Sequence, residues 1–198
     1  MFELFDRAIS SVEENCRFEL RMVSRDRDEF DHVQARHSDY FPTAVANGIQ
    51  LYRQVYRPDE PLLMLYRRFA TRQHKIQGGW LEDMLGAGLG QPVFRSFRQA
   101  AERPDDWTHE AIIQCRPTIE QVSVVFDRVV RKDFVGEERG SYYFVSPASG
   151  IVLHLYDDRG AVVAGPRKAL PGDWAAMAPR LIAKFSGPDW FQYKLRPH

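Results

Sequence analysis

The sequence predicts an α+β fold, with a mixed, largely antiparallel sheet, helices packed on it and a three-strand meander towards the C-terminus. Three observations lead to this prediction. Helical and strand-like spacings of apolar residues follow one another along the chain. Three short strand patterns separated by turn residues stand between residues 141 and 164. No repeat, low-complexity run or linker divides the 198 residues, so we expect a single domain over 1–198.

The N-terminal region predicts one helix and one strand. A helix is expected over 2–13, because its apolar residues Phe2, Phe5, Ile9 and Val12 share one helical face. From Cys16 to about Val23 apolar and charged residues alternate, which is typical of a half-buried strand. Residues 24–37 are rich in charged side chains and are expected to form an exposed loop.

The middle of the chain predicts a second helix from Pro42 to Pro58, with Val45, Ile49, Tyr52 and Tyr56 in one stripe. A buried strand is expected in the apolar run 61–66. The pattern weakens over 71–104, where five glycines interrupt it, and we expect a short helix over 92–101. A further strand is expected over 111–115.

The clearest helix is expected over 118–131. Thr118 and Gln121 have the spacing of a capping box, and a stripe follows at Ile119, Val122, Phe126 and Val129. The meander strands are expected over 141–145, 151–156 and 161–164, and this meander should pack on the 118–131 helix because the two are close in sequence. A last helix is expected over 178–185, followed by an aromatic tail around Trp190.

Charge and composition restrict the class of protein. The 27 basic residues balance the 27 acidic ones, which removes the strongest argument for nucleic acid or an acidic membrane as the partner. The charges lie in blocks: residues 1–60, 61–100, 101–140 and 141–198 carry −4, +4, −3 and +3. Such blocks favour the steering of a protein partner.

The cellular setting expected from the sequence is the cytoplasm. The first residues carry an acid at Glu3 and lack a signal-peptide pattern, and no apolar run approaches the roughly 20 residues of a membrane span. Only Cys16 and Cys115 are present, and both are expected to be reduced, buried thiols.

None of the motifs that would indicate a metal, cofactor or nucleophile is complete. His109-Glu110 begins like a zinc hydrolase motif, but Ile113 stands where the second His should be. His32 and His37 are five residues apart, which misses the spacing of two ligands on one helix face. The glycines at 86, 88 and 90 match no phosphate loop. We therefore expect no metal and no cofactor, and we assign no catalytic residue.

The segment from Ile151 to Gly160 gathers most of the candidate site residues. In a strand, His154, Tyr156 and Asp158 would share one face, which could supply a general acid and base or a metal ligand pair. A type I turn explains Asp157 and Gly160 without any function. It leaves Asp158 and Arg159 unexplained, so a salt bridge, a binding site and catalysis stay open for them.

The run His154-Leu-Tyr-Asp-Asp-Arg-Gly160 resembles the signature hairpin of a bacterial family catalogued only as a domain of unknown function. The strand Arg17–Leu20, the helix and strand between Leu51 and Leu65, and Trp190 also match its pattern. The resemblance implies a bacterial intracellular protein and fixes no activity. Small bacterial α+β proteins of this kind sometimes serve as immunity proteins for secreted toxins, and this analogy adds a candidate partner.

Two functions follow as hypotheses. The first is a non-enzymatic cytoplasmic protein that binds a protein partner, such as a toxin that it neutralises. Its expected contact residues are charged or polar: His154, Tyr156, Asp158, Arg159, Asp28, Glu29 and Asp31. The alternative is a small enzyme that uses His154, Asp158 and Arg159 in a cleft. Neither a membrane nor nucleic acid is an expected partner.

Overall fold

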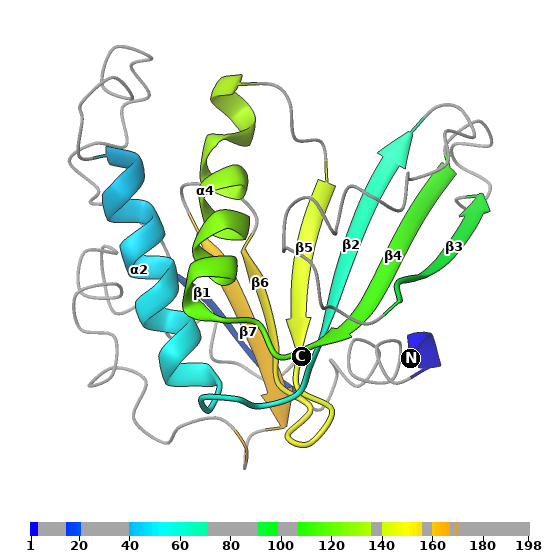
Figure 1. Ribbon diagram of the computed structural model, residues 1–198, viewed down its shortest axis with the longest axis horizontal. Coiled ribbons are helices and arrows are strands. Elements are labelled where there is room, and N and C mark those ends of the chain that lie inside the picture. Colours follow the sequence, from blue (N-terminus) through cyan, green and yellow to red (C-terminus); the bar gives the residue numbers. More distant parts are fainter. Residues whose placement is uncertain are drawn as a thin grey trace.

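A seven-stranded antiparallel sheet with two helices on one face forms the body of the molecule (Figure 1), which confirms the predicted α+β class. The computed structural model describes residues 1–3, 15–20, 40–70, 91–98, 107–135, 140–155, 160–166 and 169. Across the sheet the strands run in the order β1-β7-β6-β5-β2-β4-β3, and every neighbouring pair is antiparallel. The strands are β1 (Asn15–Leu20), β2 (Leu62–Ala70), β3 (Val93–Arg98), β4 (Trp107–Cys115), β5 (Gly140–Val145), β6 (Val152–Leu155) and β7 (Ala161–Pro166). The helices are α2 (Tyr40–Val55) and α4 (Ile119–Val135).

Both long helices lie where the apolar stripes predicted them. In α4, Val122, Phe126 and Val129 are fully buried, and the helix continues past the expected end at 131 to Val135. The capping box forms as expected, since the backbone N–H of Thr118 donates to Oε1 of Gln121 over 2.9 Å and the N–H of Gln121 donates to Oγ1 of Thr118 over 3.3 Å. These bonds satisfy N–H groups that a helix start would otherwise leave without partners.

A group of aromatic rings lies within the mainly aliphatic core between the helices and the sheet. Tyr52 of α2, Phe126 of α4 and Phe144 of β5 meet edge to face, with ring centroids 5.5 to 6.4 Å apart. The Tyr56 hydroxyl donates to the buried carbonyl of Phe144 over 2.7 Å. This bond joins the end of α2 to the sheet without leaving a buried polar group unsatisfied.

The meander is confirmed as three consecutive antiparallel strands, β5, β6 and β7. Its first turn is closed by hydrogen bonds at Ser146, whose N–H donates to the carbonyl of Ile151 and whose side-chain oxygen accepts from the N–H of Ser149. Gly150 has a φ of +72°, a conformation that favours glycine. Leu153 and Leu155 face the helices and are buried with Phe126 in one core, as the predicted packing on the 118–131 helix requires.

One element is wrong in the prediction. The segment expected as a helix over 92–101 contains the strand β3, which pairs with β4 from Val93↔Ile112 to Arg98↔Trp107. Valine and phenylalanine favour strands as readily as helices, so the pairing with β4 decides the conformation. β4 itself begins at Trp107, four residues before the expected strand.

Several predictions fall outside the described residues. They are the helix over 2–13 beyond Glu3, the loop over 24–37, the helix over 178–185 and the tail around Trp190. The turn at 157–160 also lies there, apart from Gly160.

Candidate binding site

The face of the sheet opposite α2 and α4, called here the far face, carries a row of charged side chains. The strand register sets Glu110 of β4 between Arg95 of β3 and Arg67 of β2. Directly opposed residues on neighbouring strands point to the same face of a sheet. The three side chains therefore form one group, named here the arginine cluster.

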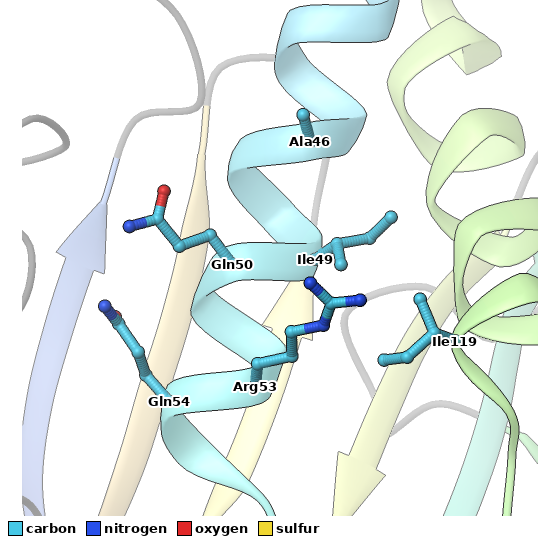
Figure 2. A pocket seen from close by; sticks show the side chains of 6 residues that line it. All are labelled: Ala46, Ile49, Gln50, Arg53, Gln54 and Ile119. Carbon is cyan, nitrogen blue, oxygen red and sulfur yellow. The ribbon is translucent and has the colours of Figure 1, made fainter.

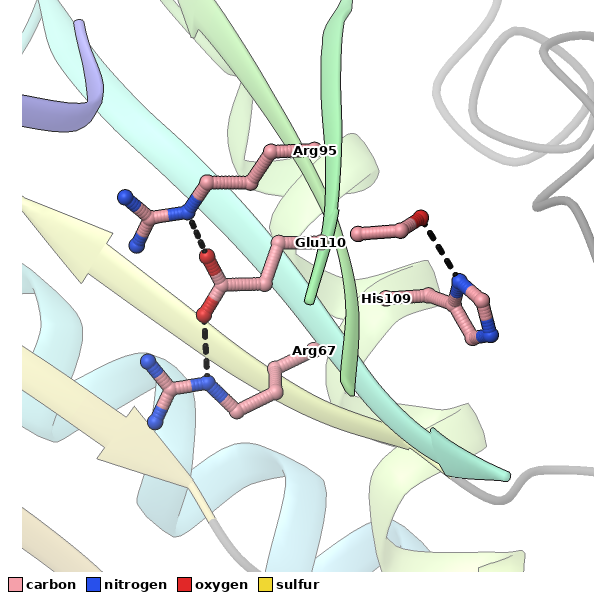
Figure 3. A network of polar contacts seen from close by, with 5 residues as sticks. Arg67, Arg95, His109 and Glu110 are labelled. Carbon is pink, nitrogen blue, oxygen red and sulfur yellow. Dashed lines mark hydrogen bonds and ion pairs between the residues drawn. The ribbon is translucent and has the colours of Figure 1, made fainter. Parts of the chain in front are cut away.

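Glu110 holds both arginines of this cluster. Its side chain is fully buried, and its Oε1 accepts from Nε of Arg67 over 2.6 Å while its Oε2 accepts from Nε of Arg95. Figure 3 shows the carboxylate between the two guanidinium groups. A buried carboxylate is costly unless it is paired, and two cations meet that need here.

Aromatic rings hold the two guanidinium groups from the other side. Arg95 lies 4.2 Å from the ring centroid of Phe2 and 5.5 Å from that of Phe97, and Arg67 lies 5.5 Å from that of Tyr143. Such stacking suits the planar guanidinium group and restricts its motion. These contacts restrain the two guanidinium groups, while 24% of the Arg67 side chain and 29% of the Arg95 side chain stay exposed.

His154, the first of the residues proposed from the sequence, stands beside this cluster. It lies on β6 opposite Tyr143, and the two rings stack with centroids 4.1 Å apart and planes 19° apart. Burial raises the pKa of Tyr143 above its ordinary value, while the charge of Arg67 and its hydrogen bond to the phenol oppose that rise. The structure thus links His154 to the arginine cluster through Tyr143.

The other residues proposed from the sequence lie outside the described residues. They are Tyr156, Asp158, Arg159, Asp28, Glu29 and Asp31. Whether Asp158 and Arg159 converge with His154 thus stays a prediction.

The edge of the sheet at β3 is a second candidate surface. Val93, Phe94 and Phe97 are 43%, 44% and 41% exposed, and β3 is the last strand of the sheet (Figure 1). Arg95 of the arginine cluster lies between them. We name Val93, Phe94 and Phe97 the β3 edge.

A shallow groove runs between α2 and α4 on the side away from the sheet. One part has a volume of about 570 Å³ and is lined by Ile49 and Arg53 of α2 and by Ile119 at the start of α4 (Figure 2). The next part, of about 560 Å³, includes Val124, which is 43% exposed. Gln50 and Gln54 also line the first part, so polar and apolar side chains both contribute to it (Figure 2).

A hydrogen-bonded Ser and His pair occurs on the helix face. Nδ1 of His109 lies 2.8 Å from Oγ of Ser96, and the His109 ring stacks on Trp107. Glu110 follows His109 in the chain but points to the far face, so its carboxylate cannot orient this imidazole. Glu110 therefore does not serve as the acid that completes a Ser-His-acid triad.

Within the described parts of the chain, no three His, Cys, Asp or Glu side chains gather closely enough to hold a metal ion. The thiol of Cys115 is buried as expected, and burial raises its pKa to about 12. No helix in the described ranges is both long and apolar enough to cross a membrane.

The sequence did not indicate the arginine cluster. In the sequence Glu110 belongs to an incomplete zinc motif, and Arg67 is one of the charges in the basic block 61–100. The pairing of β2 with β4 could have indicated it, since a charged residue inside an apolar strand needs an opposite charge on the neighbouring strand.

The chain belongs to the family described as a domain of unknown function (DUF3885), whose family model matches residues 3–170. This finding confirms the resemblance to a family of unknown function. No curated protein and no solved structure matches the chain.

Proposed function

We propose that this member of a family of unknown function binds a protein partner without turnover, and that the β3 edge is the contact. The observation that carries the proposal is the exposure of Val93, Phe94 and Phe97 on a single edge strand. Isolated apolar residues are common on surfaces, but several on one short strand are typical of an interaction site. An edge strand also offers backbone N–H and C=O groups to an added strand.

The charge beside this edge supports a partner of definite chemistry. Arg95 lies between Val93 and Phe97, and its guanidinium group is stacked on the Phe97 ring. Arginine and aromatic residues are enriched at the centres of protein interfaces. The partner that fits is therefore a protein whose contact segment combines apolar side chains with carboxylates.

The setting and the identity of the partner are further parts of the proposal. A bacterial cytoplasmic protein that neutralises a toxin would act by covering a functional surface, and it would need no catalytic group of its own. The resemblance noted in the sequence and the blockwise charge support this choice. Opposite charges accelerate association and select the partner, and added salt weakens both effects.

A matched pair of variants tests the contact. Val93 on β3 and Val124 on α4 are both 43% exposed, so Val93→Asp and Val124→Asp change the same side chain at equal exposure. Each would be co-expressed with the product of the neighbouring reading frame and analysed by size-exclusion chromatography, with circular dichroism to check folding. We expect co-elution for the wild type and for Val124→Asp, and loss of the complex for Val93→Asp.

Three outcomes would contradict the proposal. In the first, the complex persists in Val93→Asp. In the second, only Val124→Asp disrupts the complex, and in the third the wild-type chain forms only a dimer of itself. The second outcome would show that the partner binds in the groove between α2 and α4. The third would make a second copy of this chain the occupant of the edge.

The acidic residues proposed from the sequence add a separate test. Changing Asp28, Glu29 and Asp31 together to Lys should slow association with the partner and leave the thermal midpoint nearly unchanged, if this segment steers the encounter. An unchanged association rate at low salt would remove these residues from the contact.

The enzyme alternative remains a proposal that rests on His154. Its stacking on Tyr143, beside a cluster of charged groups, is the observation that favours it. A purified chain that turns over a small molecule, and loses this activity in His154→Ala, would establish the enzyme and overturn the binding function.

A further inference from the structure

Three polar residues form a row across β3, β4 and β2 on the helix face of the sheet. The strand register sets Ser96 of β3 and Arg68 of β2 on either side of His109 of β4. Ala111, two residues further along β4, shares this face and belongs to the apolar core. The polar row therefore lies beside the core, on the same face.

Ser96 and His109 differ in their exposure. Ser96 is exposed, whereas His109 is only 1% exposed. Oγ of Ser96 lies 2.8 Å from Nδ1 of His109, the contact that Figure 3 marks at the imidazole ring. A hydroxyl and an imidazole within hydrogen-bonding distance can act as a nucleophile and its general base. A small molecule can approach from the Ser96 side, while the base lies protected from solvent.

A second observation comes from Arg68, on the other side of His109. Its Nε is buried, and it has no hydrogen-bond partner in the described part of the chain. Buried polar groups without a partner are uncommon, and catalytic sites are among the places where they occur. A row of polar residues that served only the fold would be expected to satisfy this donor.

We propose that Ser96 is a nucleophile and that His109 is its general base, in a site that takes the acyl group of an ester. A serine with a histidine base is the arrangement that acyl transfer uses on several unrelated folds. Trp107 acts as a positioning residue, because its ring lies parallel to the His109 ring with centroids 6.2 Å apart.

The reaction is a single transfer. Oγ of Ser96 attacks the carbonyl carbon of the ester, and its proton passes to Nδ1 of His109. The bond from that carbon to the alcohol oxygen then breaks, the alcohol leaves with the proton from Nδ1, and the acyl group stays on Ser96. One acylation of each chain is compatible with binding without turnover, and it does not rest on the contact at the β3 edge.

The first test is labelling of the full-length chain with a fluorophosphonate, in which phosphorus takes the place of the carbonyl carbon and fluoride is the leaving group. Intact-mass and tandem mass spectrometry give the number of adducts and their position. We expect one adduct, on Ser96, which is absent from Ser96→Ala and forms more than about tenfold more slowly in His109→Gln. Ser123→Ala, at a partly exposed serine of α4, is the control and should be labelled as the wild type is.

The second test avoids any change at the buried imidazole. In Ser96→Cys, His109 should take the proton of the new thiol, so iodoacetamide should alkylate it about tenfold faster at about pH 7 than the thiol of Val124→Cys. Val124 is 43% exposed on α4, so its thiol reports the rate of an exposed cysteine without this imidazole. Tandem mass spectrometry separates these thiols from Cys16 and Cys115.

Three results would overturn the site. They are a folded wild-type chain without an adduct on Ser96, an adduct that forms equally fast in His109→Gln, and a Ser96→Cys thiol that is alkylated no faster than that of Val124→Cys. All three are measured on the isolated chain, so a failure here leaves the contact at the β3 edge to be judged by its own test.

Discussion

The two faces of the sheet differ in the interactions that bury their side chains. On the helix face, Phe126, Phe144 and Leu153 belong to one continuous apolar core with α2 and α4. On the far face, five of the described residues form a smaller buried cluster, and the charged row of Arg95, Glu110 and Arg67 lies on the same surface. Apolar burial stabilises a fold without direction, whereas buried ion pairs stabilise little and depend on geometry. The two faces therefore differ in what holds them: apolar burial dominates on the helix face, and ion pairs are prominent on the far face.

The largest effect is expected on the helix face. Phe126→Ala removes a fully buried ring that touches Tyr52 and Phe144, and it should lower the free energy of unfolding by about 3 to 5 kcal/mol. Denaturant titration measures this change. A loss under about 1 kcal/mol would show that the helix face does not carry the core.

On the far face, truncation of the shared carboxylate should cost less. Glu110→Ala leaves Arg67 and Arg95 without their common acceptor, and we expect a loss of about 2 to 3 kcal/mol. The loss stays below that of a fully buried pair because both arginine side chains are partly exposed. Glu110→Gln keeps the shape and one acceptor oxygen, so it should lose less than Glu110→Ala. Equal losses in a denaturant titration of the two variants would contradict the role of the charge.

The helix-face core should also give the stability a dependence on high pH. Burial raises the pKa of Cys115 from 9.0 to about 12, so the folded chain keeps this proton over a range in which the unfolded chain loses it. The stabilisation is complete below pH 9 and is lost as the pH rises towards 12. Between pH 8 and pH 10.5 the wild type should lose about 2 kcal/mol more than Cys115→Val.

This comparison isolates the thiol. Tyr52, Tyr56 and Tyr143 also have pKa values raised by burial and change stability in the same direction, but they are common to both proteins. Parallel stability curves for the wild type and Cys115→Val would show that the thiol is not protected by the core.

The smallest effect is expected at the start of α4, outside both faces. Thr118→Ala removes the oxygen that accepts from the N–H of Gln121, and it should cost about 1 kcal/mol. Thermal unfolding of Thr118→Ala beside Thr118→Ser, which keeps the acceptor, measures the cap. Equal midpoints for the two variants would show that the capping box does not stabilise α4.

The sequence could predict the parts of this molecule that local periodicity determines. The stripe through Phe126 and the alternation in β5, β6 and β7 each indicate which side of an element is buried, and the helix face followed from them. The strand β3 could not be predicted in this way, because six residues next to a glycine-rich segment carry too little pattern and the pairing with β4 determines their conformation.

The arginine cluster could not be predicted for a related reason. Arg67 and Glu110 are 43 residues apart, and Arg95 and Glu110 are 15 apart, so only the register of three strands brings them together. His154 was singled out from its neighbours in sequence. Its link to the cluster runs through Tyr143 on the adjacent strand.

Replacement of the whole cluster tests the division between the two faces most directly. The triple variant Arg67→Met, Arg95→Met and Glu110→Leu replaces the three charged side chains of the cluster by apolar ones, so the free energy of unfolding should stay equal or rise. Denaturant titration of the triple variant beside the wild type measures this difference. A triple variant that is less stable than the wild type by more than about 2 kcal/mol would contradict the division between the two faces.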